Sequence, residues 1–172
     1  MSFGDYLKKG WEVVKLNTQA IQELAEDEKA LGPAIGIIAI SGACWAIGAF
    51  QFLGIIYMPI LRVIGFFIFT GIVHLVAGIL FGGKGEFKQF FQPIGCAAFI
   101  TWIAIIPIAG PFFFGWLAGL WLLVPSVLAV EKIYGLDRGK AVISVLAPVI
   151  LAFIVFGILA VVGLSMLAIL GR

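Results

Sequence analysis

A single histidine, His74, lies within a long apolar stretch of this 172-residue chain and is the first candidate for chemistry. An ionisable side chain inside a membrane segment is by default a functional candidate, in proton or ligand transfer. Four other polar residues could line a pocket with it, namely Gln51, Thr101, Ser126 and Glu131. Such a pocket predicts a small channel or transporter. The alternative is a structural histidine, hydrogen-bonded to a carbonyl or hydroxyl group of a neighbouring helix.

The sequence has no arrangement of residues typical of an enzyme or a metal site. There is one histidine, no Gly-x-Ser-x-Gly elbow and no Cys-x-x-Cys pair, so we predict a non-enzyme without cofactor or metal. Gly82-Gly83-Lys84-Gly85 lacks the Ser or Thr that follows lysine in a phosphate-binding loop, and is instead typical of a helix end. Cys44 and Cys96 differ in predicted depth by ~10 Å or more, which argues against a disulfide.

The apolar runs are typical of a multi-pass membrane protein. Between residues 33 and 83 the only charged residue is Arg62, and between 94 and 130 there is none. At ~1.5 Å per helical residue both runs exceed the ~30 Å hydrocarbon core of a bilayer, so each must fold back on itself. Charged residues make up 12% of the chain, against about 25% in soluble domains. We expect an all-α bundle in the lipid bilayer, with no nucleic-acid partner.

Turn-forming and charged residues divide these runs into five predicted transmembrane helices. Tyr57-Met58-Pro59 and Ala109-Gly110-Pro111 are expected to form turns between them. The predicted helices cover about residues 33–56, 60–81, 93–108, 114–130 and 141–170. At ~45 Å the last is too long to span upright, so we expect it to tilt, to extend into the cytosol, or to bend at Pro148.

Five crossings place the termini on opposite sides, and the positive charges agree with this. The predicted N-terminal side holds nine positive residues: Lys8, Lys9, Lys15, Lys29, Lys84, Lys88, Lys132, Arg138 and Lys140. The other side holds only Arg62 and Arg172. Because positive residues concentrate on the cytoplasmic side, we predict a cytoplasmic N-terminus and a C-terminus outside.

Residues 1–31 are predicted to form a cytoplasmic or interfacial segment ahead of a membrane domain, 32–172. Apolar residues between Leu7 and Ala25 recur at helical spacing, with charged residues on the other side. One expectation is an amphipathic helix in the membrane interface, anchored by Trp11. The other is a helix that packs on the cytoplasmic end of the bundle.

Three stretches of the chain resemble a known family. They are Ala30-Leu31-Gly32-Pro33 before the first helix, the turn Gly82-Gly83-Lys84-Gly85-Glu86-Phe87-Lys88, and Leu136-Asp137-Arg138-Gly139-Lys140-Ala141 at the last helix. Together with the order and lengths of the apolar segments, they resemble the Yip domain family. These are small five-pass membrane proteins named for interaction with Ypt and Rab GTPases. The resemblance spans about Leu24 to the C-terminus.

The resemblance implies a non-enzymatic helical bundle with a cytoplasmic protein partner, and a small GTPase is the implied class of partner. Eukaryotic relatives work in early secretory traffic and have a long polar tail before the first helix. Only ~30 residues precede it here, which is typical of a prokaryotic member. The expected location is the plasma membrane in a prokaryote, and the endoplasmic reticulum or Golgi in a eukaryote.

The predicted function is a membrane scaffold that recruits a partner at its cytoplasmic face, through the mixed-charge segments 82–92 and 131–140. The expected contacts are Lys84, Lys88, Arg138 and Lys140. Alternatively, these cations only set topology and meet lipid phosphates. Two other functions stay open: the channel or transporter around His74, and lipid binding or membrane shaping. The oligomeric state, including a homo-oligomer, also stays open.

Overall fold

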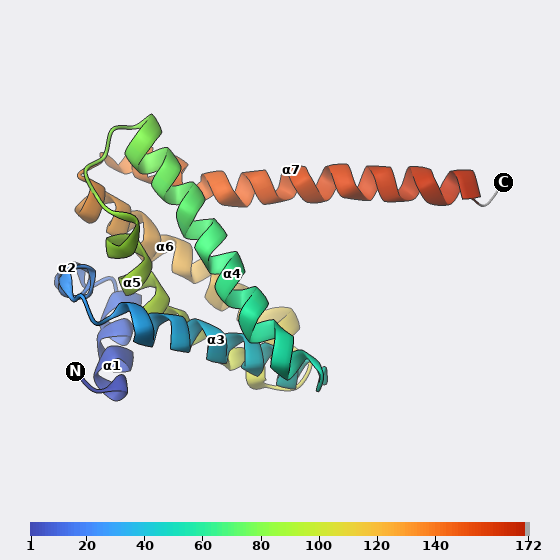
Figure 1. Cartoon of the computed structure of the whole chain (residues 1–172), viewed down its shortest axis with the longest axis horizontal. Helices are drawn as coiled ribbons and strands as arrows, with labels where there is room; N and C mark the ends of the chain where they lie inside the picture. The colour runs from blue at the N-terminus through green and yellow to red at the C-terminus, as the bar shows by residue number, and fades with distance from the viewer. Residues whose placement is uncertain (171–172) are drawn as a thin grey trace.

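The computed structural model describes the backbone of residues 1–170 and the side chains of residues 1–162, and each regular element in this part is a helix. Figure 1 shows the helices α1 (Phe3–Val14), α2 (Thr18–Glu26), α3 (Leu31–Gly48), α4 (Gly54–His74), α5 (Phe87–Ala97), α6 (Gly115–Tyr134) and α7 (Arg138–Leu170). Three shorter elements extend them, the π-helices η1 (Leu75–Leu80) and η3 (Gly110–Phe114) and the 3-10 helix η2 (Ala98–Ile105). The all-α prediction is confirmed.

Four helical segments are long and apolar enough to cross a membrane: Leu31–Gly48, Gly54–Leu80, Gly110–Tyr134 and Arg138–Val162. They match the first, second, fourth and fifth predicted helices. The third predicted helix corresponds to α5 and η2, which follow one another without a break. This segment forms the centre of the bundle, where each residue from 90 to 98 is buried.

The long segments alternate in direction between two ends of the bundle (Figure 1). Gly95 lies against Ala34 near the start of α3, and Ala104 lies against Gly48 at its end, so α3 and α5–η2 run parallel. α4 and α6 run in the opposite direction, and α7 starts at the end where α6 finishes and runs away from it. We call the end with α1, α2 and the loop 81–86 the basic end, because the nine cations predicted for the N-terminal side belong to elements there.

The polar lead forms a hairpin of two helices, whereas the sequence predicted one. Leu16 adopts a left-handed backbone conformation (φ 67) between them, and the Asn17 side chain caps α2 by accepting hydrogen bonds from two backbone N–H groups. The hairpin packs its apolar face on α5 and α6, and the Trp11 ring meets Phe99 edge to face at 6.1 Å. The hairpin therefore packs on the bundle, and its position relative to the membrane interface stays a prediction.

The first predicted turn is wrong. Residues 49–53 join α3 to α4, because Phe50 takes a left-handed conformation (φ 57) that ends α3. The predicted turn, Tyr57-Met58-Pro59, lies inside α4. This part of α4 packs on Gly42 of α3, where a Cβ would come within 2.7 Å of the Pro59 nitrogen. The glycine on α3 thus makes room for the proline that was expected to break the helix.

Three later boundaries also differ from the prediction. The predicted turn Ala109-Gly110-Pro111 is helical, because the chain turns at residues 106–108 and η3 begins at Gly110. α6 continues past Val130 to Tyr134 and ends at Gly135, whose positive φ of 67° suits a glycine cap. α7 begins at Arg138 and continues through Pro148 without interruption. The far part of α7 extends away from the bundle (Figure 1). The expected tilt, extension into the cytosol or bend of this long helix stays a prediction.

Candidate functional site

Two segments far apart in the sequence meet at the basic end of the bundle. The Lys84 N–H, in the loop after η1, donates a hydrogen bond to the Tyr134 carbonyl in the last turn of α6 (3.2 Å). The segments 82–92 and 131–140 were predicted to form the functional face because both have mixed charge. The structure places them side by side, so they form one surface.

Two glycines permit this close approach. A Cβ at Gly83 would lie 2.8 Å from the Cβ of Tyr134, and a Cβ at Gly85 would lie 2.7 Å from Cγ2 of Ile133. Real Cβ atoms do not come this close to their neighbours, because the packing of protein interiors leaves no such overlap. The loop can therefore lie directly on the end of α6 only with glycine at these positions.

A tyrosine and the single histidine connect this loop to the helices. His74 Nδ1 lies 2.8 Å from the Tyr134 hydroxyl, which also donates to the Glu86 carbonyl over 3.5 Å. Tyr134 is almost fully buried, and the ring of Phe90 packs against it, while Phe87 packs against the imidazole. The imidazole thus has a hydroxyl partner on a neighbouring helix, and this contact links α4, the loop and α6.

The five residues predicted for a polar pocket are not brought together. Gln51 lies in the turn before α4, and His74 is the last residue of that helix, about 30 Å away at the ordinary helical rise. The Thr101 and Ser126 hydroxyls donate to carbonyls of their own helices, both over 2.7 Å. Glu131 lies in the last turn of α6, close to the start of α7.

The four predicted contact cations all lie on the surface of the basic end: Lys84, Lys88, Arg138 and Lys140. Arg138 Nε lies 3.8 Å from Glu131, and Lys140 Nζ lies 3.5 Å from Asp137. The Lys140 backbone N–H also donates to Asp137 (3.1 Å) and holds the pKa of that carboxyl below its usual value. Lys84 is exposed, and among the described residues neither it nor Lys88 forms an ion pair.

Sequence reasoning missed two residues that organise this end. Tyr134 is one, and the available signal was His74, since a partly buried imidazole in an apolar segment needs a hydroxyl or carbonyl partner. Gln92 is the other: it is fully buried and its amide donates to the Asp27 carbonyl, which ties α5 to the link between α2 and α3. Nothing in the spacing of the sequence pairs Gln92 with Asp27, which is 65 positions away.

The fold and this surface define a multi-pass helical integral membrane protein. The sequence profile of the Yip1 domain matches residues 11–160, so the chain belongs to the Yip1 domain family. The match begins at Trp11 inside α1, which makes most of the N-terminal hairpin part of the family domain. The family consists of generally non-enzymatic membrane proteins related to trafficking. No curated protein and no solved structure matches the chain.

Proposed function

We propose that this protein is a membrane scaffold that recruits a soluble partner protein at its basic end. The observation that supports this most is the joining of the loop 81–86 to the end of α6, which gives two mixed-charge segments a fixed common surface. A preformed surface binds at a lower entropic cost than two mobile loops would. Lys84, Lys88, Arg138 and Lys140 then favour a partner with an acidic face, and the resemblance indicates a small GTPase.

The proposed orientation has the basic end in the cytoplasm, with five crossings and the C-terminus outside. The concentration of nine cations at one end supports it. α5 and η2 support the fifth crossing by their length. Eleven α-helical and eight 3-10 residues, at ~1.5 and ~2.0 Å each, span about 32 Å, enough for the ~30 Å hydrocarbon core.

Cysteine labelling of whole cells tests this orientation. In a background with Cys44→Ala and Cys96→Ala, a membrane-impermeant maleimide should label Ile106→Cys in intact cells, because this residue follows η2 at the end of the bundle opposite the basic end. Lys84→Cys should react only after permeabilisation. If Ile106→Cys were also protected in intact cells while Phe52→Cys was labelled, α5 and η2 would not cross the bilayer.

Photo-cross-linking in native membranes tests recruitment. A photoreactive residue in place of the exposed Lys84 should yield one abundant adduct with a soluble protein. Replacing Lys88, Arg138 and Lys140 with glutamine as well removes all four charges, and we expect the adduct to fall about tenfold or more.

A control variant tests whether the loss of the adduct comes from this surface or from a lower overall charge. The control carries three glutamine substitutions in the N-terminal segment, at Lys8, Lys15 and Lys29. It removes the same number of charges and should leave the adduct unchanged. Adducts that contain only lipid or a second copy of the chain would refute recruitment at this surface. So would an equal loss in both triple variants.

A further inference from the structure

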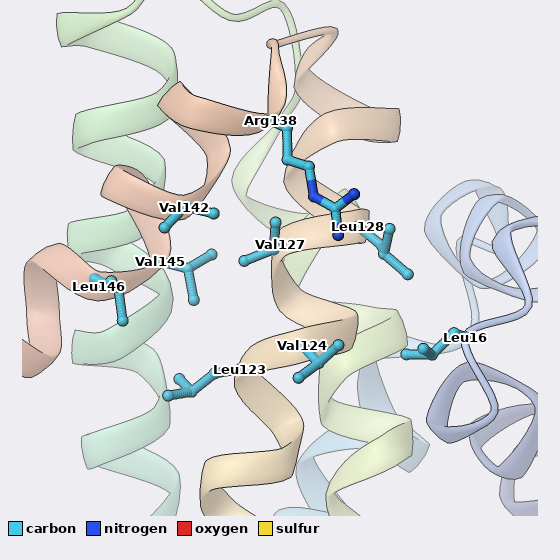
Figure 2. Close-up of a pocket in the computed structure, with 9 residues that line it drawn as sticks. All are labelled: Leu16, Leu123, Val124, Val127, Leu128, Arg138, Val142, Val145 and Leu146. Carbon is cyan, nitrogen blue, oxygen red and sulfur yellow. The ribbon is translucent and has the colours of Figure 1, made fainter.

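An apolar groove runs over α6 between the start of α7 and the turn that joins α1 to α2 (Figure 2). Its volume is about 340 Å³. Val124 and Leu128 of α6 form the floor, Val145 of α7 forms one wall and Leu16 forms the other. Eight of its nine lining residues are aliphatic, and the ninth is Arg138.

Arg138 covers one end of this groove with an exposed positive charge that is only loosely paired with Glu131. Figure 2 shows its side chain reaching from the start of α7 over α6 toward Leu128. The side chain is 83% exposed, and its Nε lies 3.8 Å from Glu131 Oε1, too far for a hydrogen bond. A guanidinium has five N–H donors in a fork that matches two oxygens of a phosphate. The groove thus has an anion-binding group at one end.

Glu131 adds a negative charge at the same end. It follows Val127 and Leu128 at helical spacings of four and three, so it continues the face of α6 that forms the groove floor. Its Oε1 atom is buried and has no hydrogen-bond partner among the described residues. The Glu131 side chain as a whole is 21% exposed and lies beside Arg138, so a ligand at this end of the groove can also donate a hydrogen bond to the carboxylate.

The groove lies where the apolar and the charged parts of the molecule meet. Leu16 belongs to the polar hairpin, and the neighbouring Lys15 pairs with Glu12 on its surface. The rest of the groove is formed by helices that qualify as membrane spans. A phospholipid fits this change from apolar to charged surface, because its acyl chain would lie in the groove and its headgroup beside Arg138 and Glu131.

We propose that this groove binds one acyl chain of a phosphatidylethanolamine-type lipid. The phosphate binds the Arg138 guanidinium, and the primary ammonium group donates a hydrogen bond to Glu131. A choline headgroup has no N–H to donate, and a phosphatidylglycerol headgroup has no positive charge to offset Glu131. The expected order of affinity is therefore ethanolamine, then choline, then glycerol. This lipid site shares Arg138 with the proposed partner surface, but lipid binding does not require the partner protein.

Native mass spectrometry of the purified full-length protein tests the proposal without any partner present. The protein is titrated with ethanolamine, choline and glycerol phospholipids that have identical acyl chains. We expect ethanolamine lipid to bind about tenfold more tightly than choline lipid. Glu131→Gln should reduce this preference to about twofold or less, and Arg138→Gln should weaken all three lipids about tenfold. Lys132→Gln, an exposed charge change on an adjacent residue, should leave both values unchanged.

Two further results decide the role of the groove itself. Val127→Phe fills the floor and should weaken all three lipids without changing their order, provided that its thermal unfolding matches that of the unmodified protein. Equal binding of ethanolamine and choline lipids, or a preference that survives Glu131→Gln, would overturn the proposal. A preference for phosphatidylglycerol would overturn it as well, because Glu131 would then have no part in headgroup binding.

Discussion

Replacement of Gly48 by valine is expected to destabilise the bundle by about 3 kcal/mol. Gly48 is the last residue of α3 and is buried against η2. A Cβ at this position would lie 2.0 Å from the Ala104 carbonyl oxygen and 3.0 Å from Cδ of Pro111. The Ala104 contact is with backbone, which cannot rotate away as a side chain could. The Gly48 carbonyl also accepts a hydrogen bond from the Ile108 N–H (2.9 Å), so a shift of α3 would break this link as well.

For Gly48→Val we expect the thermal unfolding temperature of the detergent-solubilised protein to fall by about 6–12 °C. Gly48→Ala should already cause most of this loss, because the first carbon atom makes the clash. Gly65→Val on α4 is the matched control: nothing lies within 4 Å of its Cβ position, and its effect should stay below about 1 kcal/mol. Equal losses at positions 48 and 65 would show that helix propensity, and not packing, determines the result.

Gly48 and Gly65 both lie in apolar helices, yet only Gly48 is tightly packed. The sequence predicts the helices but not which glycine is packed against a neighbour. Hydrophobic run length and charge clustering predicted an all-helical membrane protein, because the bilayer leaves few alternatives for an apolar backbone. Helix ends were predicted less well. Pro59 was expected in a turn, and it is accommodated because Gly42 lies opposite it on α3. Such a contact depends on a residue 17 positions away, so local propensity could not predict it.

The sequence predicted the two segments of the candidate surface but not the contact between them, because that contact also depends on distant residues. The segments 82–92 and 131–140 stood out by composition, and the structure shows that they touch. The contact itself depends on Tyr134, which hydrogen-bonds His74 from 60 positions away. The predicted polar pocket failed to assemble because its hydroxyl groups have a nearer option, the carbonyls of their own helices.

Replacement of Gly10 by leucine is expected to detach α1 and leave the bundle folded. Gly10 of α1 faces the backbone of α5, where a Cβ would lie 2.4 Å from the Cys96 carbonyl oxygen and 3.3 Å from the Ala97 nitrogen. α5 is held on all sides by α3, α4 and α6, whereas α1 is a terminal element held mainly by this contact. The overpacking should therefore move α1 and not α5.

Amide hydrogen exchange measures this local release. Exchange in residues 3–14 should speed up about tenfold to a hundredfold in Gly10→Leu, while residues 31–48 keep their protection. Gly4→Leu in the same helix is the control, because only the Ser2 Oγ lies near its Cβ position, at 3.8 Å. If α5 lost protection instead, the hairpin would be a part of the core. Because Leu16 of the hairpin forms one wall of the groove on α6, detachment should also weaken binding of ethanolamine lipid, although Arg138 and Glu131 are untouched.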